Sequence, residues 1–211
     1  GRHGGAKRVG PVCDVKCDDC CCLEKRALCD RDERYRMPDA VLAAYIEQYV
    51  AAQPTPVVEF VWHGGEPTLL GVDFFRRVVE LQAPYRAHKE IRNTLQTNAL
   101  SLDDEWCAFF KANDFFIGVS LDGPQEVHDR YRKDRHGAGT FERVMAGVRL
   151  LQKHQVEFNA LACVGRDTAY RPLEVYRFFK DAGIHYIQFT PIVERMPAPA
   201  TQKLGLWLAA P

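Results

Sequence analysis

Two kinds of segment alternate along this chain, and their alternation restricts the folds that it can adopt. Short runs rich in apolar and β-branched residues predict strands, and between them apolar residues recur at helical spacing. Repeated strand–helix units specify a parallel sheet with its helices outside, and right-handed crossovers allow that sheet to curl into a barrel. We therefore predict one α/β domain. Its strands would cover residues 8–12, 57–62, 91–96, 115–121, 157–164 and 185–190, and its helices residues 39–52, 72–82, 103–112, 141–154 and 173–182.

A polar or glycine-rich segment follows each predicted strand. These segments are residues 13–20, 63–68, 97–98, 122–124, 165–168 and 191–195. In a barrel of parallel strands, the carboxyl ends of the strands meet at one mouth, where active sites are built. The sequence therefore predicts one pocket that collects side chains from all six segments.

The first of these segments carries three closely spaced thiols. Cys13, Cys17 and Cys20 have the spacing C-x3-C-x2-C. A [4Fe–4S] cluster normally takes four thiolates, so three from one loop would leave one iron open to a small molecule. The spacing alone leaves a zinc site or unrelated thiols open as alternatives, because Cys21 and Cys22 offer further ligands.

Composition narrows the classes of function. The 28 basic and 28 acidic side chains balance, so no overall field favours nucleic acid or an anionic membrane. No apolar run has the length of a membrane-spanning helix, and residues 1–5 lack the apolar segment of a secretory signal. Five of the eight cysteines lie within residues 13–22, too crowded to cross-link a fold, which favours reduced, metal-binding thiols in the cytoplasm. Cys107 and Cys163 lie within apolar patterns and are predicted to be small core residues.

Two further motifs place polar side chains after predicted strands. In Gly64-Gly65-Glu66, paired glycines let a ligand approach the backbone, and the Glu66 carboxylate can accept hydrogen bonds from an ammonium group. The alternative is a tight turn with a surface acid. Ser120 and Asp122 occupy alternate positions of a predicted strand, so both side chains would point to one face.

Arg132 and the segment from Gln96 to Asn98 complete the polar set. The Arg132 guanidinium can pair with a ligand carboxylate as a fork. A solvated surface arginine is the equally weighted alternative.

Together these motifs resemble the radical S-adenosylmethionine (radical SAM) enzymes, and within them the anaerobic sulfatase-maturating group. The matching segments run in order over nearly the whole chain. They are residues 6–7, 9–13, the cysteine loop, 22–25, 62–70, 95–98, 119–124, 132–134, 156–159 and 188–195.

The resemblance implies a partial (β/α)6 TIM-like barrel with a [4Fe–4S] cluster on Cys13, Cys17 and Cys20. S-adenosyl-L-methionine (SAM) would chelate the open iron through its amino and carboxylate groups. Its amino group would meet the glycine pair and Glu66, and its carboxylate and ribose side would meet Ser120 and Arg132. The residues implied to bind the cofactor are Gly64, Gly65, Glu66, Gln96, Asn98, Ser120, Asp122 and Arg132.

The resemblance also implies an oxidoreductase reaction. Reduction of the cluster would split SAM into methionine and a 5′-deoxyadenosyl radical, which takes a β-hydrogen from a Cys or Ser of a sulfatase and leads to formylglycine. The implied partners are a sulfatase or other peptide substrate and an electron donor such as a flavodoxin or ferredoxin, with no nucleic acid and no membrane. Two alternatives remain: a maturase of another ribosomal peptide, and a non-catalytic metal-binding barrel fragment.

The chain departs from the family at several positions. Asp19, Cys21 and Cys22 stand where aromatic residues usually flank the third cluster cysteine, which would leave a cluster wetter and harder to reduce. Asp14 replaces a usual asparagine, and Ala99 stands where glycine is common. We expect residues 1–196 to form the radical SAM core and residues 197–211 to be the truncated start of a C-terminal region that would carry the catalytic base. We therefore expect this chain to cleave SAM poorly and to leave a sulfatase peptide unconverted.

Overall fold

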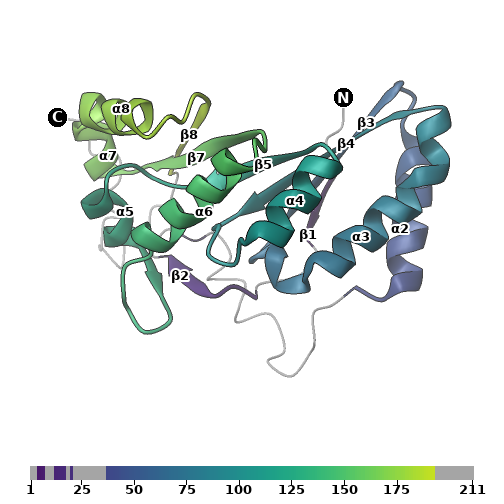
Figure 1. The fold of residues 1–211 in the computed structure, drawn as a ribbon, viewed down its shortest axis with the longest axis horizontal. Helices are drawn as coiled ribbons and strands as arrows, with labels where there is room; N and C mark the ends of the chain where they lie inside the picture. Colours follow the sequence, from purple (N-terminus) through teal and green to yellow (C-terminus); the bar gives the residue numbers. More distant parts are fainter. Residues whose placement is uncertain (1–3, 8–11, 18–19, 21–36, 193–211) are drawn as a thin grey trace, which may run out of the picture.

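A six-stranded parallel sheet forms the centre of the molecule (Figure 1). The computed structural model describes residues 4–7, 12–17, 20 and 37–192. Within these ranges the strand order is β1-β3-β4-β5-β7-β8, and every neighbouring pair is parallel. The strands are β1 (Gly4–Lys7), β3 (Val57–His63), β4 (Glu90–Thr97), β5 (Phe115–Ser120), β7 (Phe158–Val164) and β8 (Ile187–Pro191). β1 and β8 are the two edges of this open, curled sheet, which confirms the predicted partial barrel.

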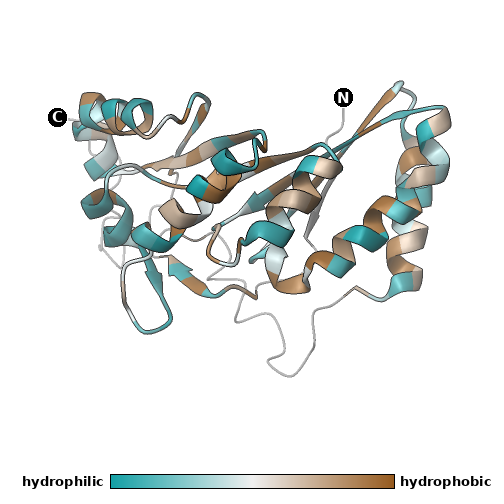
Figure 2. Ribbon diagram, viewed as in Figure 1, coloured by the Kyte–Doolittle hydropathy of each residue, from teal (hydrophilic) through white to brown (hydrophobic). Residues whose placement is uncertain are grey.

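Helices cover one face of the sheet. They are α2 (Asp39–Ala52), α3 (Val72–Gln82), α4 (Asp104–Ala112), α5 (Gln125–Tyr131), α6 (Phe141–Lys153), α7 (Arg166–Tyr170) and α8 (Pro172–Asp181), with 3-10 turns η1 (Pro67–Leu70) and η2 (Ala83–Ala87). In Figure 2, α3 and α6 are banded in teal and brown, as expected of helices with one polar and one apolar side. None of the helices in the described ranges is both long and apolar enough to cross a membrane.

The apolar core lies between the helices and the covered face of the sheet. Val58, Phe60 and Trp62 alternate along β3 and are each at most 1% exposed. The ring of Trp62 packs edge-on against Phe75 of α3, with 5.8 Å between ring centroids. The opposite face of the sheet is left open, and Arg92 of β4 is exposed there.

A small second sheet holds the cysteine loop. β2 (Val15–Cys17) pairs antiparallel with β6 (Arg132–Asp134), so that Cys17 lies opposite Arg132. The sequence pattern predicted neither strand, because each has only three residues and no apolar alternation.

The first strand differs from its prediction. Residues 4–7 form β1 and pair with residues 60–63 of β3, whereas the prediction assigned residues 8–12. Of that range, residues 8–11 lie outside the described residues, and Val12 is in no strand. The sequence of β1 is Gly-Gly-Ala-Lys, which has little strand propensity. The strand is defined by its backbone pairing with β3, and its side-chain pattern gives no signal of a strand.

Cys107 and Cys163, both predicted to lie in the core, differ in burial. Cys107 is buried, as predicted, but the prediction for Cys163 is wrong, because this residue is only partly buried. Ala160 and Ala162 of β7 point to the covered face. Since side chains alternate along a strand, Cys163 faces the open side.

Candidate active site at the carboxyl ends of the strands

The cysteine loop lies at the carboxyl ends of the strands. Cys13, Cys17 and Cys20 are all partly buried, and the Cys20 amide donates to the carbonyl oxygen of Cys17 at 3.3 Å. Burial raises the pKa of the Cys13 thiol to about 11, and the charge of Cys20 adds to this shift. In the described part of the chain, no three side chains of His, Cys, Asp or Glu converge on a point where one metal ion would sit. A cube binds its ligands at separate corners, so thiols that hold a cube need not converge.

The glycine pair brings two chain segments into contact. A Cβ atom on Gly65 would lie 1.8 Å from the carbonyl oxygen of Val12, and that oxygen accepts a hydrogen bond from the Glu66 amide at 2.8 Å. We predicted that the glycines admit a ligand, but the group that requires the missing side chain at Gly65 is the Val12 backbone. The turn therefore fixes the start of the cysteine loop.

Glu66 is a buried acid, so the surface-acid alternative is wrong. Its Oε1 accepts hydrogen bonds from the amide and hydroxyl of Thr68, at 3.0 and 2.7 Å, and from the hydroxyl of Thr97 at 2.7 Å. Its Oε2 accepts one bond, from the Asn98 amide at 2.7 Å. Burial raises the pKa of Glu66, and these four donors oppose the shift. Each carboxylate oxygen carries about two lone pairs, so Oε2, which accepts the bond from Asn98, has a second acceptor position.

Asn98 connects the end of β4 to the cysteine loop. Its Nδ2 donates to Asp14 Oδ1 at 2.6 Å and lies 3.9 Å from the Sγ of Cys13. Gln96 precedes it on the open face of the sheet and is exposed. The structure thus brings Asn98, Glu66 and Cys13 together, as expected of polar segments that meet at one edge of the sheet.

Asp122 and Arg132 form a buried ion pair. Arg132 donates from Nε to Asp122 Oδ2 at 2.6 Å and from Nη2 to Oδ1 at 2.9 Å, and the two side chains are 11% and 2% exposed. Burial disfavours the charged guanidinium, but the attraction of Asp122 outweighs it and raises the pKa of Arg132. The surface-arginine alternative is therefore wrong, and the predicted fork pairs with an internal carboxylate.

Ser120 ends β5 one residue earlier than predicted. Because Asp122 lies beyond the strand, strand alternation does not set its direction, and Asp122 is buried while Ser120 stays partly exposed. The remaining Arg132 nitrogen, Nη1, lies 3.8 Å from the Sγ of Cys17.

The comparison with known families shows the superfamily of this chain. Residues 8–179 match the sequence profile of the radical SAM superfamily. The chain belongs to the radical SAM superfamily.

Curated relatives within this superfamily include anaerobic sulfatase-maturating enzymes. A serine-type enzyme of Bacteroides thetaiotaomicron is 46% identical over 190 residues, which are 90% of this chain and 46% of the relative. A cysteine-type enzyme of Clostridium perfringens (strain ATCC 13124) is 38% identical over 154 residues, which are 72% of this chain and 41% of the relative. The chain thus spans about half the length of the curated relatives it matches.

Solved structures agree on the fold. Native anSMEcpe with bound AdoMet superposes with a TM-score of 0.84 at 32% identity, covering 96% of this chain and 54% of that one. Streptococcus suis SuiB bound to S-adenosylmethionine has a TM-score of 0.66 at 15% identity, covering 97% and 42%. The likeness to SuiB concerns the fold alone.

The residues present fit the cofactors of the radical SAM superfamily. Three partly buried cysteines share one loop, the second acceptor position on Glu66 Oε2 suits an ammonium group, and Nη1 of Arg132 lies beside Cys17. Asp19, Cys21 and Cys22 lie outside the described residues, so their predicted effects on the cluster stay predictions.

Three residues of the candidate site were missed by the sequence interpretation. Cys163 donates its amide to Asp122 Oδ1 at 2.9 Å, and its Sγ lies 3.5 Å from Nη2 of Arg132. His128 and Thr140 are buried next to the same ion pair. The only sequence signal for His128 is its position one helical turn before Arg132, which is too common to have identified it.

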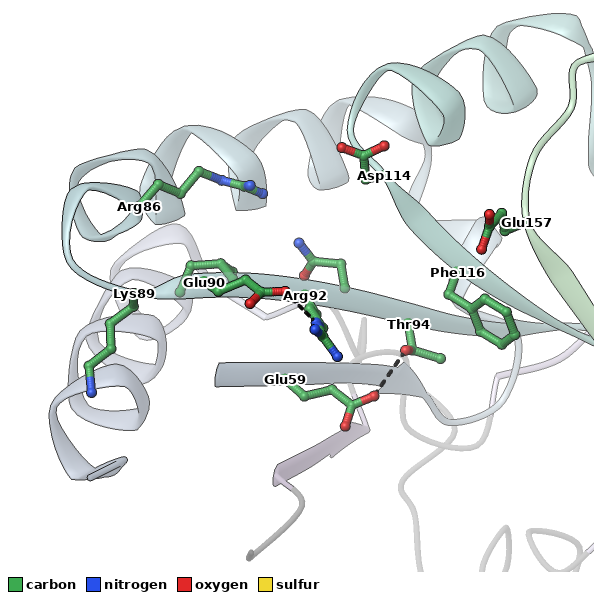
Figure 3. Close-up of a pocket in the computed structure, with 11 residues that line it drawn as sticks. Glu59, Arg86, Lys89, Glu90, Arg92, Thr94, Asp114, Phe116 and Glu157 are labelled. Carbon is green, nitrogen blue, oxygen red and sulfur yellow. Dashed lines mark hydrogen bonds and ion pairs between the residues drawn. The ribbon is translucent and has the colours of Figure 1, made fainter. Parts of the chain in front are cut away.

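A separate hollow lies at the other end of the strands (Figure 3). It has a volume of about 600 Å³ and is lined by residues near the amino ends of β4, β5 and β7, including Arg92, Asp114 and Glu157. Within it, Thr94 donates to Glu59 at 3.3 Å. None of the predicted cofactor residues lines this hollow, so the candidate site is the polar edge at the carboxyl ends of the strands.

Proposed function

We propose that this chain is the radical-generating core of an anaerobic sulfatase-maturating enzyme. The observation that carries the proposal is the attachment of one three-thiol loop on two sides. Val12 joins the loop to the Gly64-Gly65-Glu66 turn, and β2 joins it to β6 beside Arg132. The serine-type and cysteine-type relatives, at 46% and 38% identity, support the choice of group within the superfamily.

In this proposal Cys13, Cys17 and Cys20 hold a [4Fe–4S] cluster, and the polar strand ends orient SAM. The chemistry that the cluster supplies when bound is the one-electron cleavage of SAM into methionine and a 5′-deoxyadenosyl radical. Oε2 of Glu66 accepts a hydrogen bond from the SAM ammonium group, and Nη1 of Arg132 attracts the SAM carboxylate.

The remaining predicted residues orient the other parts of SAM. Ser120 faces the carboxylate and ribose side of SAM, and Gln96 lies nearby on the open face of the sheet. Asp122 holds Arg132 in place, and Asn98 holds the loop through Asp14.

The proposed substrate is a Cys or Ser in a sulfatase peptide, which is oxidised to formylglycine. An electron donor such as a flavodoxin or ferredoxin supplies the electron. We place this chemistry in the cytoplasm, because an iron–sulfur site that takes reduced cysteines as ligands suits a reducing compartment.

The proposal is tested by anaerobic reconstitution with iron and sulfide, followed by incubation with SAM and dithionite. We expect slow formation of 5′-deoxyadenosine, measured by mass spectrometry, and none from a variant with Cys13, Cys17 and Cys20 changed to Ala. A cluster-loaded chain that forms no 5′-deoxyadenosine contradicts the proposal and supports a non-catalytic metal-binding barrel.

The substrate class is tested separately by binding. We expect a sulfatase peptide with the target Cys or Ser to change the electron paramagnetic resonance (EPR) spectrum of the SAM-loaded cluster, and a peptide with Ala at the target position to change it less. Equal effects of the two peptides contradict the sulfatase assignment and favour a maturase of another peptide.

A further inference from the structure

A buried hydrogen-bonded chain extends from the ion pair into the protein. The Thr140 hydroxyl donates to the carbonyl oxygen of Arg132 at 2.9 Å, and Nε2 of His128 lies 3.0 Å from the same hydroxyl oxygen. On the other side of the imidazole ring, the Asp122 amide lies 3.5 Å from Nδ1. His128 thus lies beside the backbone amide of Asp122 and, through the Thr140 hydroxyl, is connected to the backbone carbonyl of Arg132.

The directions of these bonds fix the state of the ring. Because the Thr140 hydroxyl gives its proton to Arg132, its oxygen must accept from His128, which places a proton on Nε2. Nδ1 is then unprotonated and faces the Asp122 amide. Burial, together with the charge of Arg132, lowers the pKa of His128 to about 4, which agrees with a neutral ring.

The other end of this series of hydrogen bonds lies at the cysteine loop. The Arg132 guanidinium has Nη1 at 3.8 Å from the Sγ of Cys17, and the two residues are opposite each other in the β2–β6 pair. Asp122 occupies Nε and Nη2, so the orientation of the guanidinium depends on where Asp122 and the Arg132 backbone are held.

A fixed cation next to a cluster thiolate affects the cluster's reduction. Reduction adds one negative charge to the cube, and a nearby positive charge stabilises the reduced form. The potentials of iron–sulfur clusters depend on local charge and on hydrogen bonds to their sulfur atoms. The position of Arg132 relative to Cys17 is therefore a means of setting the potential.

We propose that His128 is a positioning residue that, through Thr140 and Asp122, holds the Arg132 guanidinium against Cys17 and so keeps the reduction potential of the cluster high enough for its reduction. The inference rests on the proposed cluster at Cys13, Cys17 and Cys20. It assigns His128 and Thr140 no contact with the cluster, with SAM or with a substrate.

The test is an EPR-monitored redox titration of the reconstituted chain and four variants. His128→Leu and Thr140→Val each remove one link, and we expect both to lower the equilibrium constant for reduction about tenfold, which is about 59 mV for a one-electron couple. His128→Gln keeps an N–H group near the Nε2 position, and Thr140→Ser keeps the hydroxyl. Both should stay within about twofold of the unmodified chain, or about 18 mV on the same scale.

Thermal unfolding of the cluster-free proteins provides the second readout. A purely structural role would lower the melting temperature of His128→Leu and Thr140→Val and leave the potential of the loaded cluster unchanged, and that result overturns the inference. A change in the cluster's reduction potential in His128→Gln equal to that in His128→Leu also overturns the inference. If His128→Leu does not fold, the reduction potentials of Thr140→Val and Thr140→Ser are compared instead. An unmodified chain that takes up no cluster overturns the proposed function along with this inference.

Discussion

Gly65 and Val12 lie so close together that the Val12 carbonyl oxygen occupies the space of a side chain at Gly65. The Cβ of an alanine there would be 1.8 Å from that oxygen. The next amide, that of Glu66, donates to the same oxygen at 2.8 Å. The contact connects the cysteine loop to the turn after β3, two segments that are more than fifty residues apart in the sequence.

Gly65→Ala should separate these two segments. We expect the free energy of unfolding to fall by ~1–3 kcal/mol, because an overpacked site must shift its backbone, and we expect iron uptake to fall with it. Urea unfolding and iron analysis measure the two effects. Gly137→Ala is the matched control: Gly137 has φ of 84° but no atom within 4 Å of an added Cβ, so it should cost about 1 kcal/mol and leave iron uptake unchanged. Equal iron uptake in the two variants contradicts the prediction.

Asp122→Asn should strongly destabilise the protein. The substitution leaves the Arg132 guanidinium, only 11% exposed, without its charged partner. Breaking a buried ion pair in this way costs ~3–5 kcal/mol, which we expect as the loss in free energy of unfolding by urea.

The control for Asp122 is Glu90→Gln in the Arg92–Glu90 pair, whose side chains are 62% and 56% exposed. An exposed pair contributes ~0–1 kcal/mol. Losses of similar size in the two variants would show that the Asp122 pair is not buried as described.

The sequence interpretation predicted which strand ends meet but not how their side chains pair. The strand alternation around Trp62 is strong, and β3, β4, β5, β7 and β8 were predicted closely. Arg132 and Glu66 are charged, and no sequence pattern distinguishes a buried charge with an internal partner from an exposed one. Their partners, Asp122 after β5 and Thr97 at the end of β4, lie in other segments of the chain and become apparent only in three dimensions.

Ala99 is a position where the departure from the family has a structural meaning. Its φ is 61°, in the left-handed region that favours glycine. The family resemblance implies glycine at this position, and the positive φ is a physical reason for that preference. Alanine is accommodated at this φ, with its methyl group almost fully buried.

The neutral His128 predicts how stability depends on pH. The ring titrates near 6.5 in the unfolded chain and near 4 in the folded one. The unfolded state therefore binds more protons between these values, and stability is lost as pH falls from about 6.5 toward 4. Burial and Arg132 cause the shift, against Asp122 and Asp129.

At ~1.4 kcal/mol per pKa unit the loss is about 3 kcal/mol. Urea midpoints at pH ~7.5 and ~4.5 measure it. His128→Gln has no titrating group at this site, so its loss over the same range should be smaller by about that amount. An equal loss in the variant and the unmodified chain would contradict a buried neutral histidine.

Ser120→Ala should weaken SAM binding to the cluster-loaded chain. Ser120 ends β5 on the open face of the sheet and is partly exposed. Its loss should cost ~1.5–3 kcal/mol of binding free energy, the range for a hydrogen bond to a charged group, as measured by calorimetry. Thr94→Val changes a hydroxyl in the other hollow, beside Glu59, and should leave the affinity unchanged. A weaker affinity in Thr94→Val alone would move the cofactor to that hollow.

The central claim is that Cys13, Cys17 and Cys20 hold a [4Fe–4S] cluster with one iron open to SAM. Its most direct test is the EPR spectrum of the reduced, reconstituted chain, recorded with and without SAM. We expect a [4Fe–4S] signal that changes when SAM is added, no such signal after all three cysteines are changed to Ala, and an unaltered signal in Cys107→Ala, where the thiol is buried in the core. A signal that persists in the triple variant, or one that does not respond to SAM, would contradict the account.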